Sequence, residues 1–246
     1  MTDDIDPSTP LTRTAVSNAV EAIGWRYLLG TLGTSVAVTS FDHGLQMTAA
    51  AATACGSDTD EHLRIDVRPD RVELSLQTRA TGRITARDIE VARAISSAVG
   101  ELGGTTGGTT TAELARPVQM LEIAIDAIDI PAIRPFWKAV MAFDDEPGSS
   151  NPDDAIVDST GQLPAIWFQQ MDEPRPQRNR IHFDITVSHD EAEARVKAAL
   201  DAGGVLVSDA AKRSFWILAD VEGNEVCVCT WLDRDERDAA RVAAPA

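Results

Sequence analysis

The chain has 246 residues and a formal charge of −17 at pH 7, from 22 lysines and arginines against 39 aspartates and glutamates. This acidic excess argues against binding to nucleic acid or to an anionic membrane surface, because both require clustered basic side chains. No apolar run is long enough to span a membrane, and residues 1–7 lack the basic and apolar parts of a signal peptide. Three cysteines cannot all pair within one chain. The length predicts one or two domains. The lack of a signal peptide and of a disulfide framework favours a cytoplasmic protein.

Helical and strand patterns alternate in the first hundred residues. They predict a helix over 11–23, a hairpin over 25–38, a helix over 41–55, a strand over 72–77 and a helix over 85–99. Gly24 could end the first helix, and Thr85 with Asp88 three positions later is typical of a helix start. This order predicts an α+β fold with helices packed on one face of an antiparallel sheet.

A segment made only of glycine and threonine, residues 103–111, follows these elements. Such a composition is typical of a flexible linker. We therefore predict a first domain over 1–102, a linker over 103–116 and a second domain over 117–246.

The second half repeats one order of elements. It predicts a strand over 119–127, a helix over 131–143 and short strands near 154–158 and 164–170, then a strand over 180–187, a helix over 190–202 and strands near 205–208, 214–219 and 225–230. Two successive βαβββ units fit this order.

Five segments of the second half carry a resemblance to a known superfamily. They are residues 125–131 (IDAIDIP), 135–140 (PFWKAV), 164–170 (PAIWFQQ), 175–184 (RPQRNRIHFD) and 220–227 (DVEGNEVC). Over residues 117–231 the chain resembles the vicinal oxygen chelate superfamily, in particular its glyoxalase-like branch. The resemblance implies two βαβββ modules that form a cup-shaped sheet around one small-molecule site.

Enzymes of that superfamily often hold a divalent metal with His, Glu or Gln side chains from the first and last strands of each module. The resemblance places these positions at Glu122, Gln169 or Gln170, His182 and Cys227. Cys227 stands where the pattern has Glu, and Gln is a weak neutral ligand. We therefore expect a metal-independent site without a cofactor, and a divalent metal stays an alternative. In the other interpretation His182 is a hydrogen-bond partner in the cup and Cys227 a small buried residue.

Further residues could contact a ligand in this cup. Arg175, Arg178 and Arg180 would bind an anionic ligand at its rim, or lie solvated in an exposed connection between the modules. Asp184, in the His-Phe-Asp segment, and Trp167 complete the expected ligand-binding residues.

The first half carries a second resemblance. Its residues are Trp25 after Gly24, Phe41-Asp42, residues 68–74 (RPDRVEL), and Thr78 followed by residues 82–88 (GRITARD). Over residues 10–101 the chain resembles a degenerate pterin-4a-carbinolamine dehydratase.

The dehydratase family uses two imidazoles as acid and base, from a His-His-Pro segment and a later Thr-His pair. Here these segments are Glu61-His62-Leu63 and Thr78-Arg79, so one of three histidines is kept. Arg79 stays protonated and cannot act as a base, although it could bind a ligand. Glu61 with His62 could still move a proton.

Three functions remain open from the sequence. The first, which the sequence favours, is a small-molecule lyase or isomerase-like enzyme that uses His182 and Glu122 in the C-terminal cup, and the other two are alternatives. The second is a 4a-hydroxytetrahydrobiopterin dehydratase with its site at His62. The third is a non-catalytic protein that binds or sequesters a small molecule, which could be anionic or pterin-like. We also expect a homo-oligomer, because the dehydratase-like fold is commonly oligomeric.

Overall fold

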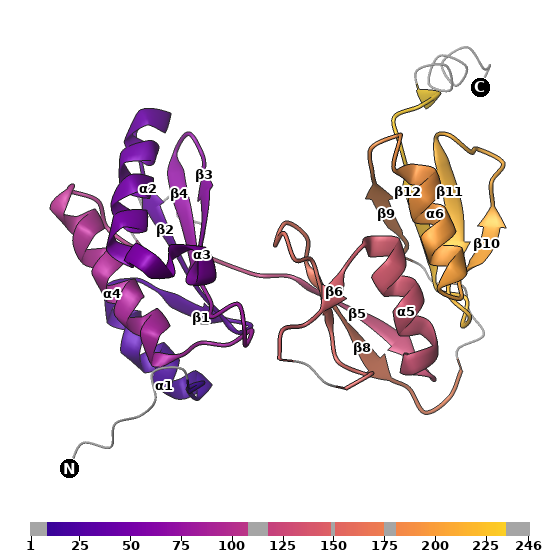
Figure 1. Ribbon diagram of the computed structural model, residues 1–246, viewed down its shortest axis with the longest axis horizontal. Helices are drawn as coiled ribbons and strands as arrows, with labels where there is room; N and C mark the ends of the chain where they lie inside the picture. The colour runs from indigo at the N-terminus through magenta and orange to yellow at the C-terminus, as the bar shows by residue number, and fades with distance from the viewer. Residues whose placement is uncertain (1–8, 108–117, 149–150, 175–180, 235–246) are drawn as a thin grey trace. The chain divides into compact units, whose positions relative to one another are not determined.

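The computed structural model describes residues 9–107, 118–148, 151–174 and 181–234 (Figure 1). The chain divides into two compact units, residues 1–120 (unit 1) and residues 121–246 (unit 2). Within the described residues, no helix has the length and apolar character that a membrane span requires.

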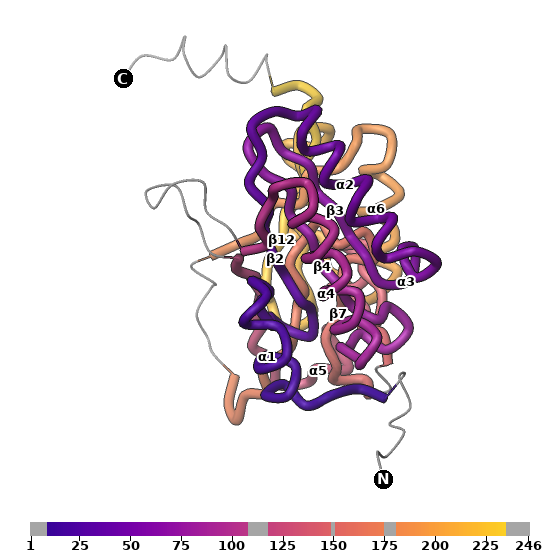
Figure 2. Tube along the Cα trace, turned by 90° about the vertical axis from the view of Figure 1, so that its left-hand side faces the viewer, coloured from indigo at the N-terminus to yellow at the C-terminus, as the bar shows by residue number. Residues whose placement is uncertain are grey.

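Unit 1 is an antiparallel sheet covered by helices. In chain order it contains α1 (Arg13–Val20), β1 (Arg26–Leu28), β2 (Thr31–Ala37), α2 (Phe41–Cys55), α3 (Thr59–His62), β3 (Leu63–Val67), β4 (Arg71–Leu76) and α4 (Ala86–Glu101). The strand order is β1-β2-β4-β3, and every neighbouring pair is antiparallel. One face of the sheet packs on the helices and forms a core around Trp25, Leu76 and Ile95. The path of this unit can be followed as the indigo-to-magenta tube in Figure 2. The predicted α+β arrangement is confirmed.

Helix ends in unit 1 follow the sequence signals with one difference. The first helix ends at Val20 and continues as a 3₁₀ turn to Ile23, and Gly24 then adopts a left-handed φ of 79°. At the start of α4, the backbone N–H of Thr85 donates to Oδ2 of Asp88 at 2.7 Å. The predicted helix start at Thr85 is therefore present as a capping box.

Residues 104–107, which belong to the segment expected to be a linker, pack on unit 1. Thr106 bridges to Val36 in β2 and donates its hydroxyl to the carbonyl of Ile23 at 2.7 Å. A Cβ added to Gly24 would overlap the backbone carbonyl of Thr106. The close approach of the two backbones thus requires glycine at position 24.

Unit 2 consists of two modules with the same order of elements. The first contains β5 (Glu122–Ala127), α5 (Ile130–Met141), β6 (Asp144–Asp145), β7 (Ile156–Val157) and β8 (Ala165–Gln170), and the second contains β9 (Phe183–Thr186), α6 (Ala192–Asp201), β10 (Val205–Ser208), β11 (Phe215–Ala219) and β12 (Glu225–Cys229). The sheets have the orders β5-β8-β7-β6 and β10-β11-β12-β9. In each module the last strand pairs in parallel with the first. The two predicted βαβββ units are confirmed.

The two modules share one hydrophobic core and are joined by polar contacts. Trp137 of α5 meets the ring of Phe183 in β9 edge-on, with centroids 6.1 Å apart. The indole N–H of Trp137 donates to the buried carboxylate of Asp220 at 2.9 Å. The carboxylate of Glu222 accepts the backbone N–H groups of Ile128 and Asp129 at 2.7–3.0 Å, just before α5 begins. A negative charge is favourable at that helix end, so the turn at 220–224 fixes the second module to the first.

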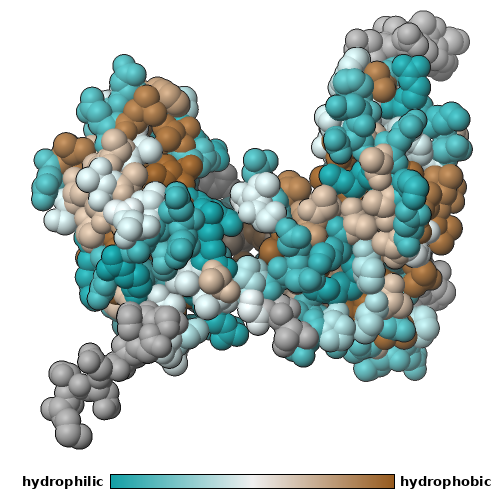
Figure 3. Space-filling model, viewed as in Figure 1, coloured by the Kyte–Doolittle hydropathy of each residue, from teal (hydrophilic) through white to brown (hydrophobic). Residues whose placement is uncertain are grey.

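The outer edge of the second module is apolar. Strand β10 is an edge strand, and its residues Val205, Leu206 and Val207 are 43–52% exposed. Figure 3 shows hydrophobic surface at this edge of unit 2. The pairing of β10 with β11 is interrupted between Leu206 and Ser208. Such irregularities at an edge oppose the addition of a further strand.

Candidate functional site

A buried polar cluster of unit 1 joins His62 to Asp88. His62 is the last residue of α3 and Asp88 lies in the first turn of α4. Nδ1 of His62 lies 2.7 Å from Oδ1 of Asp88. The imidazole is 8% exposed and the carboxylate is fully buried. The fold therefore brings together two residues that are 26 positions apart.

The other oxygen of Asp88 accepts three further hydrogen bonds. Its donors are the hydroxyl of Thr78 at 2.7 Å, the backbone N–H of Thr85 at 2.7 Å and the hydroxyl of Thr85 at 3.0 Å. Because an ionised carboxylate can only accept hydrogen bonds, Nδ1 of His62 carries the proton that it donates to Asp88. The free ring nitrogen, Nε2, is then the atom that can exchange a proton with a ligand.

Glu61 and Arg79 flank this pair. Both residues are exposed, and the backbone N–H of Arg79 donates to the carbonyl of Glu61 at 3.1 Å. The guanidinium of Arg79 donates to the carbonyl of Leu63 at 3.1 Å, and among the described residues it forms no ion pair. Its remaining N–H groups are available to a ligand.

In unit 2, three of the expected residues form a cluster. Asp184 in β9 and Cys227 in β12 are direct partners in the parallel pair, and His182 lies two positions before Asp184. Nδ1 of His182 is 3.5 Å from Oδ1 of Asp184 and 3.8 Å from Sγ of Cys227. The side chains of His182 and Asp184 are each 57% exposed, and Cys227 is buried. Both contacts of the imidazole involve Nδ1, whereas a Cys-His-Asp catalytic relay uses both ring nitrogens.

The cysteines of the chain are free, buried thiols. Burial, followed by the hydrogen bond and the charge of Asp184, raises the pKa of the Cys227 thiol to about 12. Burial also raises the pKa of Cys229 and of Cys55. Near neutral pH, Cys227 is therefore a neutral thiol and a poor nucleophile.

The remaining expected residues of the first module are spread along its sheet. Glu122, Trp167 and Gln169 are exposed and share one face of the β5–β8 pair. The side-chain amide of Gln170 instead donates to the carbonyl of Ile128 at 2.8 Å. Arg175, Arg178 and Arg180 lie outside the described residues.

The metal set implied by the superfamily resemblance does not fit this arrangement. Glu122 is not part of the group formed by His182, Asp184 and Cys227, the one such group among the described histidines, cysteines and acidic residues. The amide of Gln170 is already bound to backbone carbonyls. A four-ligand site that spans both modules is therefore not assembled by these side chains.

Asp88 is the site residue that the sequence did not reveal. In the sequence, Asp88 stands out only because it follows Thr85 by three positions, a spacing typical of a helix start. Its contact with His62 depends on how α3 and α4 pack, which the local sequence pattern does not show.

Two family models match the chain. The model of the pterin 4 alpha carbinolamine dehydratases matches residues 9–98, and that of the glyoxalase-like domain matches residues 122–229. No curated protein matches the chain.

Several solved structures are similar to part of the chain. A transcriptional coactivator/pterin dehydratase from Brucella melitensis is 24% identical, with 37% of this chain and 98% of that chain covered and a TM-score of 0.33. The fosfomycin resistance protein FosX from Mesorhizobium loti is 12% identical, with 50% and 99% covered and a TM-score of 0.39. A glyoxalase/bleomycin resistance protein from Albidiferax ferrireducens T118 is 15% identical, with 44% and 95% covered and a TM-score of 0.35. By the two family models, the chain joins a pterin-4a-carbinolamine dehydratase-like segment to a glyoxalase-like segment.

Proposed function

We propose that the protein is a small-molecule lyase of the dehydratase type, and that its reaction takes place in unit 1 at His62. The observation that carries this proposal is the 2.7 Å contact between Nδ1 of His62 and the buried carboxylate of Asp88. This contact fixes the tautomer of His62 and leaves Nε2 for proton transfer. The cluster in unit 2 is looser, and its imidazole is exposed.

The proposed reaction removes a hydroxyl group as water. In its imidazolium form His62 gives the Nε2 proton to the leaving hydroxyl while Nδ1–H stays bonded to Asp88, and a base removes a proton from a neighbouring N–H of the substrate. Glu61, which precedes His62 and is exposed, is the group that we assign as this base. General acid–base catalysis of this kind contributes about 10²–10⁴ in rate.

The substrate class follows from the match to the dehydratase family and from the residues that differ. A 4a-hydroxypterin is the first candidate because that family dehydrates it. Arg79 replaces an imidazole of the family with a permanent positive charge, which favours a ligand that carries an acceptor or an anionic group. We propose that no metal takes part at His62, because the Asp88 carboxylate is already engaged by four donors.

A second candidate is the lyase or isomerase-like reaction in unit 2, with His182 and Glu122 as acid and base. The arrangement of His182 supports it, since within the described parts of the chain both polar contacts of that ring are at Nδ1 and leave Nε2 for a ligand. Binding or sequestering without reaction is the third candidate. Association with further copies of the chain also stays a proposal, and light scattering should give a multiple of the mass of one chain. The three free thiols fit a reducing compartment such as the cytoplasm.

The test measures dehydration of a 4a-hydroxypterin by the full chain. We expect His62→Gln to lower the rate about 10²-fold or more, and Asp88→Asn to lower it as well by disturbing the tautomer. The control His43→Gln changes a histidine of unit 1 whose ring, among the residues that the structure describes, hydrogen-bonds with Thr39 and not with the His62 cluster, so the rate should stay unchanged.

Full activity of His62→Gln would refute the proposal. Loss of activity in His182→Gln but not in His62→Gln would instead support the reaction in unit 2. A compound that binds tightly and is recovered unchanged, with no turnover of the pterin, would support the binding protein.

A further inference from the structure

We propose that the substrate of unit 1 carries a phosphate monoester, and that Arg79 and Arg83 bind this group beside His62. Both arginines belong to the turn over residues 78–83, between β4 and α4. The anion site rests on the dehydratase function proposed for His62, because that function supplies the pterin ring to which the phosphate is attached. The two arginines select the ligand, whereas His62 transfers the proton.

Hydrogen bonds hold the backbone of this turn. The carbonyl of Thr78 accepts the backbone N–H of Gly82 at 3.0 Å, and the N–H of Thr78 donates to the carbonyl of Arg83 at 3.1 Å. The side-chain amide of Gln77 donates to the carbonyl of Gly82 at 3.0 Å. The turn therefore has a fixed shape before a ligand arrives, which lowers the entropy cost of binding.

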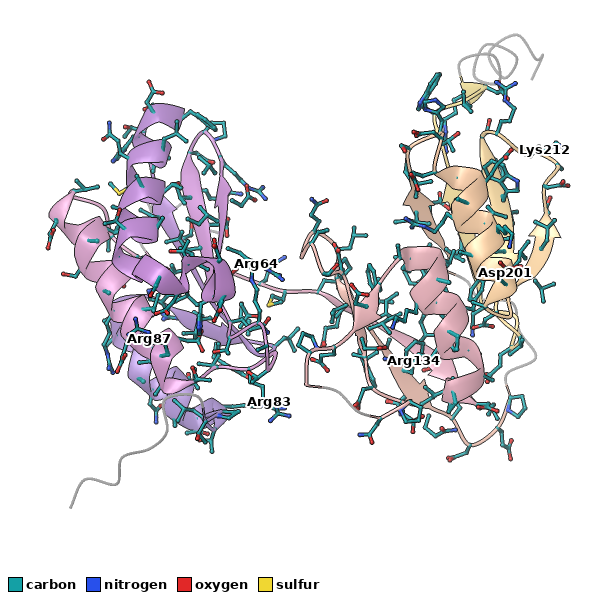
Figure 4. All side chains as sticks on the ribbon, in the orientation of Figure 1. Arg64, Arg83, Arg87, Arg134, Asp201 and Lys212 are labelled. Atoms are coloured by element: carbon teal, nitrogen blue, oxygen red, sulfur yellow. The ribbon has the colours of Figure 1, made fainter. Side chains whose placement is uncertain are left out.

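The turn borders the His62 cluster. The hydroxyl of Thr78 lies 3.4 Å from Nδ1 of His62. Nη2 of Arg79 donates to the carbonyl of Leu63, the residue after His62, at 3.1 Å. Arg83 is the direct partner of Thr78 in an antiparallel bridge, and Figure 4 shows it at the surface of unit 1. Both arginines thus extend from backbone that adjoins the proposed catalytic histidine.

Neither Arg79 nor Arg83 forms an ion pair with an acidic side chain in the part of the chain that the structure describes. Other arginines of unit 1 do so at 2.5–3.0 Å: Arg68 with Asp66, Arg71 with Asp70 and Glu73, and Arg87 with Asp58 and Glu90. Two positive charges are therefore available beside His62. Because the chain has a net charge of −17, an anionic ligand needs such a local attraction to bind.

Two guanidinium groups suit a phosphate better than a carboxylate. One guanidinium can bind both oxygens of a carboxylate. A phosphate monoester has three terminal oxygens and a charge of about −1.5 to −2 at pH 7, so it can accept hydrogen bonds from two guanidinium groups. Of the N–H donors of Arg79, one is bound to Leu63 and the others are available.

The experiment compares two ligands that differ only in the proposed anion. The full chain is titrated by calorimetry with a 7,8-dihydropterin that has a hydroxyalkyl side chain, and with the same dihydropterin phosphorylated on that side chain. We expect the phosphorylated ligand to bind about tenfold or more tightly. Because Arg79 and Arg83 are exposed, this preference should shrink at high salt. Arg79→Gln and Arg83→Gln should each reduce it, and the double variant should abolish it.

The control Arg68→Gln removes the same charge from the turn between β3 and β4, at the end of these strands away from His62. It should keep the preference for the phosphorylated ligand. Arg83→Gln changes an exposed side chain, so it keeps the test valid if Arg79→Gln fails to fold. Equal affinity for the two ligands, or a preference that persists in the double variant, would overturn the proposal.

His62→Gln separates the anion site from the dehydratase function. This variant should lose turnover of the 4a-hydroxy form of the phosphorylated pterin and keep the binding preference. An arginine-dependent preference without turnover in the unchanged chain would refute the dehydratase function and support the anion site. Turnover of the two 4a-hydroxypterins with equal kcat/KM, together with equal affinities, would support the dehydratase function and refute the anion site.

Discussion

Nε1 of Trp137 lies 2.9 Å from Oδ2 of Asp220, and this hydrogen bond connects the helix of the first module to the turn before the last strand of the second. Both side chains are buried, at 1% and 2% exposure. The other oxygen of Asp220 accepts the backbone N–H groups of Glu222 and Asn224. One carboxylate therefore shapes the turn and attaches it to α5.

We expect Trp137→Phe to destabilise unit 2 by about 1–3 kcal/mol, because a buried carboxylate oxygen loses a donor. Hydrogen exchange of β5 and β12 peptides, followed by mass spectrometry, measures the stability of unit 2 separately from that of unit 1. The matched control is Trp167→Phe, which changes an exposed tryptophan and should alter exchange by less than about 0.5 kcal/mol. Equal effects of the two substitutions would show that the bond to Asp220 contributes nothing.

In unit 1, we expect Gly24→Ala to destabilise more strongly than Gly103→Ala. Both glycines have positive φ, 79° and 77°, so both variants carry a backbone cost of about 1 kcal/mol. Only at Gly24 would the added Cβ meet backbone, that of Thr106, whereas nothing lies within 4 Å at Gly103. Exchange of β2 amides should therefore be clearly faster in Gly24→Ala. Similar exchange in the two variants would argue that residues 104–107 do not pack on unit 1 in solution.

A pH-dependent contribution is expected from Asp145. Hydrogen bonds from Lys138, and then from Arg134, which is labelled in Figure 4, lower the pKa of this carboxyl. Because the pKa of Asp145 is lower in the folded than in the unfolded state, its ionised carboxylate stabilises the fold at pH values above the unfolded-state pKa. This stabilisation is lost as the pH falls through the folded-state pKa. Because the side chain is largely exposed, we expect Asp145→Asn to cost only about 0.2–1 kcal/mol at pH 7.

The control for this prediction is Asp144→Asn. Asp144 is exposed and forms no ion pair within the described residues. Hydrogen exchange of α5 peptides at pH 7 should distinguish the two variants. The difference should shrink as pH falls below about 4. A difference that persists at lower pH would show that charge on Asp145 is not its cause.

The longer elements could be predicted because their patterns are periodic. The helix expected over 41–55 matches α2, and the alternating run over 72–77 corresponds to β4. By contrast, β6 has two residues and α3 has four, too few for a period to show. The order β5-β8-β7-β6, repeated in the second module, depends on pairing between distant strands, which local patterns do not contain.

The candidate sites could be predicted only in part. The family resemblance pointed to His62, but Asp88 was visible only as a helix-start residue. Oδ1 of Asp88 contacts His62, and Oδ2 accepts the backbone N–H of Thr85 at the start of α4. In unit 2, the expected combination of Cys227 with Glu122 followed the superfamily pattern. The structure instead pairs Cys227 with Asp184, because the register of β9 against β12 places them opposite each other.

The position of β12 as the last strand has a consequence for how unit 2 is completed during synthesis. Cys227 reaches His182 and Asp184 only after more than forty intervening residues have left the ribosome and β12 has paired with β9. A chain that stops at residue 224 would hold all of the first module and the dehydratase-like segment, yet it would lack the whole of β12. Premature termination near the C-terminus would therefore leave β9 and β11 without the strand that lies between them, while leaving His62 and its partners intact.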